Sequence, residues 1–467
     1  MLERWFELRA HGTNVSTETL AGLTTFMTMS YIIIVQPAIL SSAGMDFGAV
    51  MMATCISAAV STLIMGFWAN YPVALAPAMG ENIFFAYTIV LAMGVAWQNA
   101  LGMVLLSGLL FIVLSLFRVR ELVLDAVPLE LRRAIAAGIG AFILVLGLQH
   151  AGVLVRHHEI WQKLFSAKNA WQALSHGEWS FAADLTRIYG FGSAWGSVQL
   201  VAGVGLAVMM LLMLLRRRAA LLTGMVAAAA LALILGLITW QGVTSAPPDI
   251  SPTLWKFDLR CLFTWELLPL VLVFLFMDLF DTIGTLIGVA EQARLVGPDG
   301  RLPRARRALL ADAVGTTVGA ALGTSTVTSY IESAAGVQAG GRTGLTAVVC
   351  ALLFVAAMFF SPLVQMIGSG VPAGEGVTLY PVTAAALMVV GVLMLKSLKG
   401  MAWKKWDTSV PAILIVIGIP LSYSIADGLA FGFISYPALK ILAGRGRDVS
   451  WLIYLLGIIF LLRYIFL

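Results

Sequence analysis

Long apolar runs separated by short polar segments form the hydropathy pattern of this chain. Each run approaches the roughly 20 apolar residues that a helix needs to cross a bilayer. The first set of runs is 20–40, 49–69, 72–91, 97–117, 133–154, 197–215 and 219–240. The second set is 265–290, 308–323, 324–340, 345–365, 376–395 and the Gly/Pro-punctuated region 409–443, which is long enough for two short arms. The pattern therefore predicts two sets of seven membrane elements.

Two segments lie outside this count. The run 450–467 is predicted to be an extra C-terminal helix, and the polar segment 155–196 an extracytoplasmic loop. Because each set holds an odd number of elements, the second set must be inverted relative to the first. The sequence thus predicts an all-α integral membrane protein with 14 transmembrane elements in a 7+7 inverted repeat.

The composition agrees with a membrane location. Of 467 residues, 60% are hydrophobic and only 11% are charged, which excludes an ordinary soluble domain. The formal net charge of +5 does not indicate nucleic-acid binding, because the basic residues gather in short loops between apolar runs. Such loops are typical of the cytoplasmic side. We therefore expect a multi-pass protein of the cell inner membrane, with a retained first span and a cytoplasmic N-terminus.

Elements three and ten, at 72–91 and 324–340, are both interrupted and both carry polar residues in mid-stretch. In the first, Pro77 and Gly80 break the helix; in the second, a polar stretch at 324–329 precedes small residues. Broken segments at corresponding positions of two halves point to the binding site of a transporter. We expect each to be a short strand followed by a half-helix, the second half-helix starting near 329–331.

Ionisable residues mark the same region. Asp278 and Asp281 interrupt the apolar run 265–290, and Glu332 lies in element ten. Ionisable groups at membrane depth are expensive, so they usually face a water-filled path or the bundle interior. On a helix, Asp278, Asp281 and Thr285 would follow one face. A structural alternative remains for each: Asp278 could cap a helix or pair structurally, Asp281 could bond an amide of a broken helix, and Glu332 could serve only as a cap of its half-helix.

Element three offers Asn82, whose amide can present a donor and acceptors to a planar heterocycle. Glu81 points about 100° away from Asn82 on a helix, so a structural pairing is as plausible as a functional one. Aromatic residues near the polar positions, Phe84 above all, could supply a stacking face. His150 stands alone in an apolar run, and the three cysteines have no ligand spacing, so no metal or cofactor is predicted.

Four segments carry a resemblance to a known family: ALAPAMGENIFFAYT, FMDLFDTIGTLIGVAEQ, RRALLADAVGT and GTSTVTSYIESAAGVQAGGRTGLTA. They resemble the adenine/guanine/hypoxanthine permeases of the AzgA-like (azaguanine-resistance) branch of the nucleobase/ascorbate transporter superfamily. By motif match, the family's substrate-site residues fall on Asn82, Asp281 and Glu332. The sequence departs from the commoner family pattern at Ala78, where glycine is usual, and at Glu81, where an apolar residue is frequent.

The resemblance also implies an architecture. A core, substrate-binding domain would comprise 20–117 and 265–365, and a gate domain 132–240 and 376–443. The family implies proton-coupled purine uptake by an elevator-like movement of the core against the gate, and a homodimer formed through the gate domain.

We therefore predict a purine nucleobase importer. Asp281 is the candidate proton carrier and Glu332 the main substrate anchor, although the reverse assignment stays open. The predicted substrate-binding residues are Asn82, Asp281, Glu332, Thr285, Phe84, Ser333 and Ile331, with Glu81, Asp278, Phe280, Ala78 and Gly80 as additional candidates.

The same fold could carry xanthine or uracil, or a small anion, although an anion carrier would favour neutral or positive residues at positions 281 and 332. A membrane-embedded enzyme would need a His/Asp cluster of metal-ligand spacing, which the sequence does not offer.

Overall fold

A computed structural model describes residues 2–116, 128–156, 189–191, 196–215, 217, 219–260, 267–293, 295, 303–368, 370–372, 378–399, 401 and 403–466. The chain divides into two compact units. The first comprises Met1–Asp125, Val208–Val226 and Thr239–Ser369, and the second Ala126–Ala207, Ala227–Ile238 and Gly370–Leu467. The predicted loop 155–196 lies mostly outside the described residues. At its ends, strands β2 (Leu154–Arg156) and β3 (Tyr189–Phe191) pair antiparallel.

Seven stretches among the described residues have the length and apolar composition of a membrane span. They are Val15–Ser42, Phe47–Ala69, Trp97–Leu116, Leu129–His150, Ser197–Leu214, Gly344–Gly368 and Pro381–Leu398. Shorter apolar helices cover Met79–Ala92, Ala220–Ile234, Leu268–Leu279 and Trp406–Ser422. Each of these stretches overlaps an element that the hydropathy pattern predicts. The mostly helical architecture expected from the sequence is therefore confirmed.

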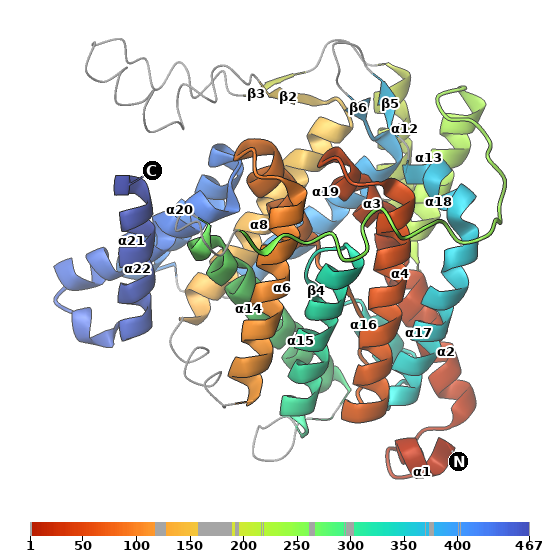
Figure 1. Ribbon diagram of the computed structural model, residues 1–467, viewed down its shortest axis with the longest axis horizontal. Helices are drawn as coiled ribbons and strands as arrows, with labels where there is room; N and C mark the ends of the chain where they lie inside the picture. Colours follow the sequence, from red (N-terminus) through yellow and green to blue (C-terminus); the bar gives the residue numbers. More distant parts are fainter. Residues whose placement is uncertain are drawn as a thin grey trace. The chain divides into compact units, whose positions relative to one another are not determined.

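The helices of the first unit come from both halves of the chain. The first half supplies α1 (Leu2–Phe6), α2 (Val15–Met29), α3 (Ile32–Ser42), α4 (Phe47–Ile64) with the π-helical η1 (Met65–Ala69), and α6 (Trp97–Leu116). The second half supplies α14 (Leu268–Gln292), α15 (Ala305–Leu322), α17 (Gly344–Ala357), the 3-10 turn η4 (Met358–Phe360) and α18 (Ser361–Gly368). Helix α6 packs against α14 and α15, and α17 packs against α2 and α4 (Figure 1).

Close packing between the halves depends on glycine at one crossing. A Cβ atom added to Gly344, at the start of α17, would overlap the backbone of Gly66 in η1. Because any side chain at position 344 would push these backbones apart, the sequence dictates glycine at this contact.

The first predicted element, 20–40, differs from expectation because it is interrupted. Helix α2 ends at Met29, and α3 begins at Ile32 after Ser30 and Tyr31. Pro37 lies inside α3, where it cannot donate a backbone hydrogen bond. The interruption places the Tyr31 side chain, which is 1% exposed, inside the first unit.

The second unit contains α8 (Leu129–His150), α19 (Pro381–Leu395) with the 3-10 turn η5 (Lys396–Leu398), α20 (Trp406–Ser422) and α21 (Ile425–Leu442). It also contains strands β5 (Val371–Pro372) and β6 (Thr378–Leu379), the turn η6 (Gly446–Asp448) and helix α22 (Trp451–Phe466). Helix α8 packs against α19 and α20, α20 against α21, and α21 against α22. The boundary between the units passes through α12 (Ser197–Leu214) and α13 (Ala220–Ile234). Region 409–443 therefore forms two helical arms, as the pattern predicts.

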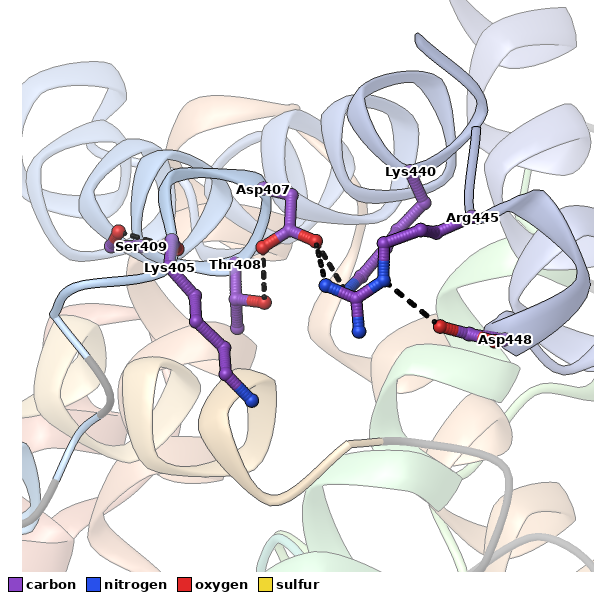
Figure 2. A network of polar contacts seen from close by, with 7 residues as sticks. All are labelled: Lys405, Asp407, Thr408, Ser409, Lys440, Arg445 and Asp448. Atoms are coloured by element: carbon purple, nitrogen blue, oxygen red, sulfur yellow. Dashed lines mark hydrogen bonds and ion pairs between the residues drawn. The ribbon is translucent and has the colours of Figure 1, made fainter. Parts of the chain in front are cut away.

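A buried ion pair joins the two arms (Figure 2). Lys440 Nζ, near the end of α21, lies 2.7 Å from Asp407 Oδ2 in the first turn of α20. Arg445 Nη1 also approaches Asp407 Oδ2, at 3.2 Å, and Arg445 Nε lies 3.2 Å from Asp448. The Lys440 and Asp407 side chains are only 6% and 12% exposed, whereas Arg445 is 49% exposed. Lys440 is therefore the main partner of the Asp407 charge.

Replacing Lys440 by methionine is expected to lower the apparent melting temperature of the detergent-purified protein. Removing one partner of a buried ion pair costs about 3–5 kcal/mol, because the other charge stays buried without compensation. The double variant Lys440→Met/Asp407→Asn should recover part of the loss. The exposed Lys404, replaced by methionine, is the matched control. Equal melting temperatures for Lys440→Met and Lys404→Met would contradict a stabilising role of the pair.

Candidate functional site

The two broken elements meet in a short antiparallel pair of strands. Strand β1 (Leu75–Pro77) pairs with β4 (Val327–Ser329), with Leu75 opposite Ser329 and Pro77 opposite Val327. Both strands are buried along their whole length. Irregular backbone at membrane depth is tolerated only where it is enclosed by protein or lines a cavity. Here the strands pair with each other, and the backbone groups of Leu75 and Val327 bond the hydroxyls of Thr62 and Thr316. Elements three and ten are thus brought together as the sequence predicts.

Each strand leads into a short helix. Strand β1 continues into α5 (Met79–Ile83) and the π-helical η2 (Phe84–Ala92), and β4 is followed by α16 (Ser333–Gln338). The predicted start of the second half-helix, near 329–331, is wrong by about two residues. The reason is the strand pairing: Tyr330 N still donates to Ala74 O at 2.9 Å, which keeps the chain extended up to that point.

Glu332 occupies the residue position just before α16. Its side chain makes no capping hydrogen bond to the helix, so the alternative that Glu332 serves only as a cap is wrong. Instead, the Tyr31 hydroxyl donates to Glu332 Oε1 at 2.9 Å. The neighbouring Ile331 is 52% exposed, whereas Ser333 is buried and its Oγ accepts from Ala74 N at 3.0 Å. Among the described residues, Tyr31 is thus the side chain that bonds the Glu332 carboxylate.

Helix α14 carries the other predicted carboxylates, and they differ in exposure. Asp281 is exposed although it lies in the middle of an apolar helix, while Asp278 and Thr285 are buried. Helix α14, which carries Asp281, packs against α5, which carries the buried Glu81, and against α16, which Glu332 precedes. The three carboxylates come from α14, from the residue preceding α16 and from α5, so the structure brings both half-helices and α14 together.

Asn82 lies in α5 and is fully buried. Its Oδ1 accepts a hydrogen bond from Ser325 Oγ, and its Nδ2 has no hydrogen-bond partner in the described part of the chain. Ala78 and Gly80, also predicted as candidates, are buried at the start of the same helix. Phe84 is fully buried and packs edge-to-face on Phe274, 4.9 Å between ring centroids, so its ring is covered in this structure. The side chain of Phe280 lies outside the described residues.

A layer of buried hydroxyls and carboxyls lies against strand β4. Thr316 Oγ1 donates to Asp278 Oδ2 at 2.8 Å, and Thr282 Oγ1 donates to Asp312 Oδ2 at 2.7 Å. Ser329 Oγ completes the layer by donating to Asp312 Oδ1 at 3.2 Å. These contacts tie helices α14 and α15 to the strand that leads to Glu332. Asp278 is thus engaged by α15, which is the structural alternative that its sequence position left open.

Sequence reasoning did not identify Asp312 as a site residue, although it is the one carboxylate of the RRALLADAVGT segment. It also missed Glu18, which is fully buried. Glu18 Oε1 accepts from Arg342 N at 2.8 Å, and Oε2 accepts from Thr346 Oγ1 at 2.5 Å, at the start of α17. Arg342 Nη1 in turn donates to Val337 O at 2.6 Å, at the end of α16. Glu18 therefore helps to hold the half-helix against α17.

His150 is buried at the end of α8 in the second unit. Its ring centroid lies 5.1 Å from that of Tyr380, which is a packing contact. Among the described residues, no group of three His, Cys, Asp or Glu side chains has the arrangement of a metal site.

The sequence matches the Permease family (Xan_ur_permease) over residues 16–175 and 163–430. It is 40% identical to the adenine permease AdeP of Escherichia coli, covering 100% of this chain and 96% of that protein. It is also 40% identical to the guanine/hypoxanthine permease PbuO of Bacillus subtilis, covering 98% of this chain and 99% of that protein.

Among solved structures, the transmembrane domain of the cyanobacterial bicarbonate transporter BicA is similar in fold. The TM-score is 0.61 at 14% identity, covering 90% of this chain and 97% of that one. The similarity concerns the fold alone, which is a seven-plus-seven inverted repeat.

Proposed function

The chain belongs to the Permease family (Xan_ur_permease), and on that basis we propose that it imports purine nucleobases by proton symport. As a member of this family it is a multi-pass membrane transporter and not an enzyme. The names of its relatives, which include adenine and guanine/hypoxanthine permeases, support a nucleobase substrate. They agree with the purine class expected from the sequence motifs.

The observation that carries the proposal is the meeting of two half-helices and α14 at three carboxylates, of which Asp281 is exposed, Glu332 half-buried and Glu81 buried. A purine is planar and presents N–H donors beside ring-nitrogen and carbonyl acceptors. Carboxylates of Asp281 and Glu332 suit the N–H edge, and the amide of Asn82 suits an acceptor. A site built from such groups should reject analogues that leave a carboxylate or an amide unpaired.

In this proposal Asp281 carries the coupled proton and Glu332 anchors the base. The side chain of Asp281 is exposed in the described structure, and in the proposed cycle it exchanges its proton with water before substrate binding. The core domain (20–117 and 265–365) would carry the site past the gate domain (132–240 and 376–443) in an elevator-like movement, and the gate would form a homodimer.

Uptake of radiolabelled guanine, hypoxanthine, adenine, xanthine and uracil by cells expressing the chain tests the proposal. Uptake of guanine, hypoxanthine or adenine should exceed that of an empty-vector control and should collapse when a proton uncoupler is added. Uptake of uracil or xanthine alone would assign the same fold to another nucleobase. Bicarbonate or sulfate uptake without any nucleobase uptake would assign it to a small anion.

A further inference from the structure

A chain of buried polar side chains leads from helix α3 to Asn82. Gln36, in α3, is fully buried, and its Nε2 donates to Thr324 Oγ1 at 2.9 Å and to Ser325 Oγ at 3.4 Å. Ser325 Oγ then donates to Asn82 Oδ1. Ser325 has one hydroxyl hydrogen, and this hydrogen is donated to Asn82 Oδ1. The three side chains therefore form a directed relay, Gln36 to Ser325 to Asn82.

The relay ends in an unused donor. Asn82 is 0% exposed, and in the described residues its Nδ2 has neither a protein partner nor solvent. A buried donor without a partner costs free energy, so native proteins retain such groups where another function requires them. Asn82 lies in α5, and α5 packs against α14, the helix that carries the exposed Asp281.

We propose that Gln36 and Ser325 are positioning residues that make Asn82 present an N–H donor, and not a carbonyl, to the substrate. The inference rests on the proposed function and adds a specificity rule to it. With the amide held so that Nδ2 faces the substrate, Asn82 binds only substrates that place a ring-nitrogen or carbonyl acceptor opposite Nδ2. Without the relay, the amide can rotate and pair with either a donor or an acceptor.

Replacing the Gln36 amide by a carboxylate tests the direction of the relay. In Gln36→Glu the side chain can only accept, so it captures the Ser325 hydrogen. Asn82 must then donate to Ser325, which leaves its Oδ1 facing the substrate. Ser325→Ala removes the relay altogether. Thr326 provides the matched control, because it is the next residue, is buried, and its hydroxyl makes no hydrogen bond in the described structure.

The measurement is inhibition of radiolabelled hypoxanthine uptake by 3-deaza-, 7-deaza- and 9-deazahypoxanthine, which each lack one ring-nitrogen acceptor. Purine is tested as well; it lacks the carbonyl acceptor and has an acceptor in place of the N1–H donor. In the wild type, at least one analogue should inhibit about tenfold or more weakly than hypoxanthine, because it leaves the donor unpaired. The ratio of that analogue's inhibition constant to the inhibition constant of hypoxanthine should approach one in Asn82→Ala. It should shrink several-fold in Ser325→Ala and Gln36→Glu, and it should stay unchanged in Thr326→Val. Immunoblotting of membranes confirms that each variant is present.

An unchanged ratio in Ser325→Ala or in Gln36→Glu, with uptake retained, would overturn the relay. If Ser325→Ala is absent from membranes, two other variants decide the question. Gln36→Glu should shrink the ratio, and Ser325→Thr should keep it because threonine retains the hydroxyl. A wild-type chain that takes up no purine at all would refute the proposed function instead, so the two failures are distinguishable.

Discussion

Asp281→Asn is expected to abolish concentrative uptake while leaving exchange of substrate across the membrane. A proton that moves with the substrate contributes about 2.3 kcal/mol per 100 mV of membrane potential, which corresponds to about 50-fold accumulation. Asparagine cannot release or bind that proton, so the variant should equilibrate the base without accumulating it. Its initial uptake rate should also lose the stimulation by external acid that we expect of the wild type.

The measurement compares two assays in proteoliposomes: accumulation driven by an imposed proton gradient, and counterflow of labelled against unlabelled purine. Asp249→Asn is the matched control, because Asp249 is exposed in a loop and bonds only within it, to Ser251 Oγ at 2.7 Å among the described contacts. Full accumulation with uncoupler sensitivity in Asp281→Asn would show that the coupled proton travels elsewhere.

Much of the fold was predictable because the length and spacing of the apolar runs determine where membrane helices form. The broken elements at 72–91 and 324–340 were predicted from Pro77, Gly80 and a polar stretch. Pro77 and the end of the polar stretch lie in strands β1 and β4, whereas the prediction that Gly80 breaks the helix is wrong, because Gly80 lies inside α5. Carboxylates in apolar runs are equally visible in a sequence, which is why Asp281 and Glu332 could be selected in advance. Their roles as substrate and proton ligands remain predictions.

The partners of these residues could not be predicted, because they come from elements far away in the chain. Tyr31 lies 301 positions from Glu332, and Gln36 lies 289 positions from Ser325. Neither residue stands out, since a tyrosine or a glutamine in an apolar run carries no charge. The break in the first element, which turns Tyr31 inward, was also not predictable, because positions 30 and 31 are serine and tyrosine and not the helix-breaking proline or glycine.

The boundary of the second half-helix illustrates a different limit. Small residues after Tyr330 are compatible with a helix, and local sequence therefore favours an early start. The pairing of β4 with β1 keeps the backbone extended through Tyr330, so a tertiary contact overrides local preference. This delay leaves Glu332 outside the helix, where its carboxylate is free to bond the Tyr31 hydroxyl.

Glu332→Gln is expected to raise the KM for purine uptake by about 10- to 150-fold. A hydrogen bond to a charged group contributes about 1.5–3 kcal/mol, and each 1.4 kcal/mol is about tenfold in affinity. In the structure Glu332 Oε1 is occupied by the Tyr31 hydroxyl, so the substrate's N–H group would bind Oε2. A glutamine can keep the Tyr31 contact through its oxygen, but its other atom becomes a donor and faces the substrate's donor.

Tyr31→Phe distinguishes the role of the Glu332 carboxylate from that of the Tyr31 hydroxyl that bonds it. It removes one hydroxyl from a fully buried ring, so it should raise KM less than Glu332→Gln does, with little change in the maximal rate. Glu3→Gln is the matched control, because Glu3 is exposed in α1 and bonds Arg9 N in the described structure. Uptake kinetics over a range of hypoxanthine concentrations decide the question. A wild-type KM in Glu332→Gln, at equal membrane abundance, would mean that the base binds without Glu332.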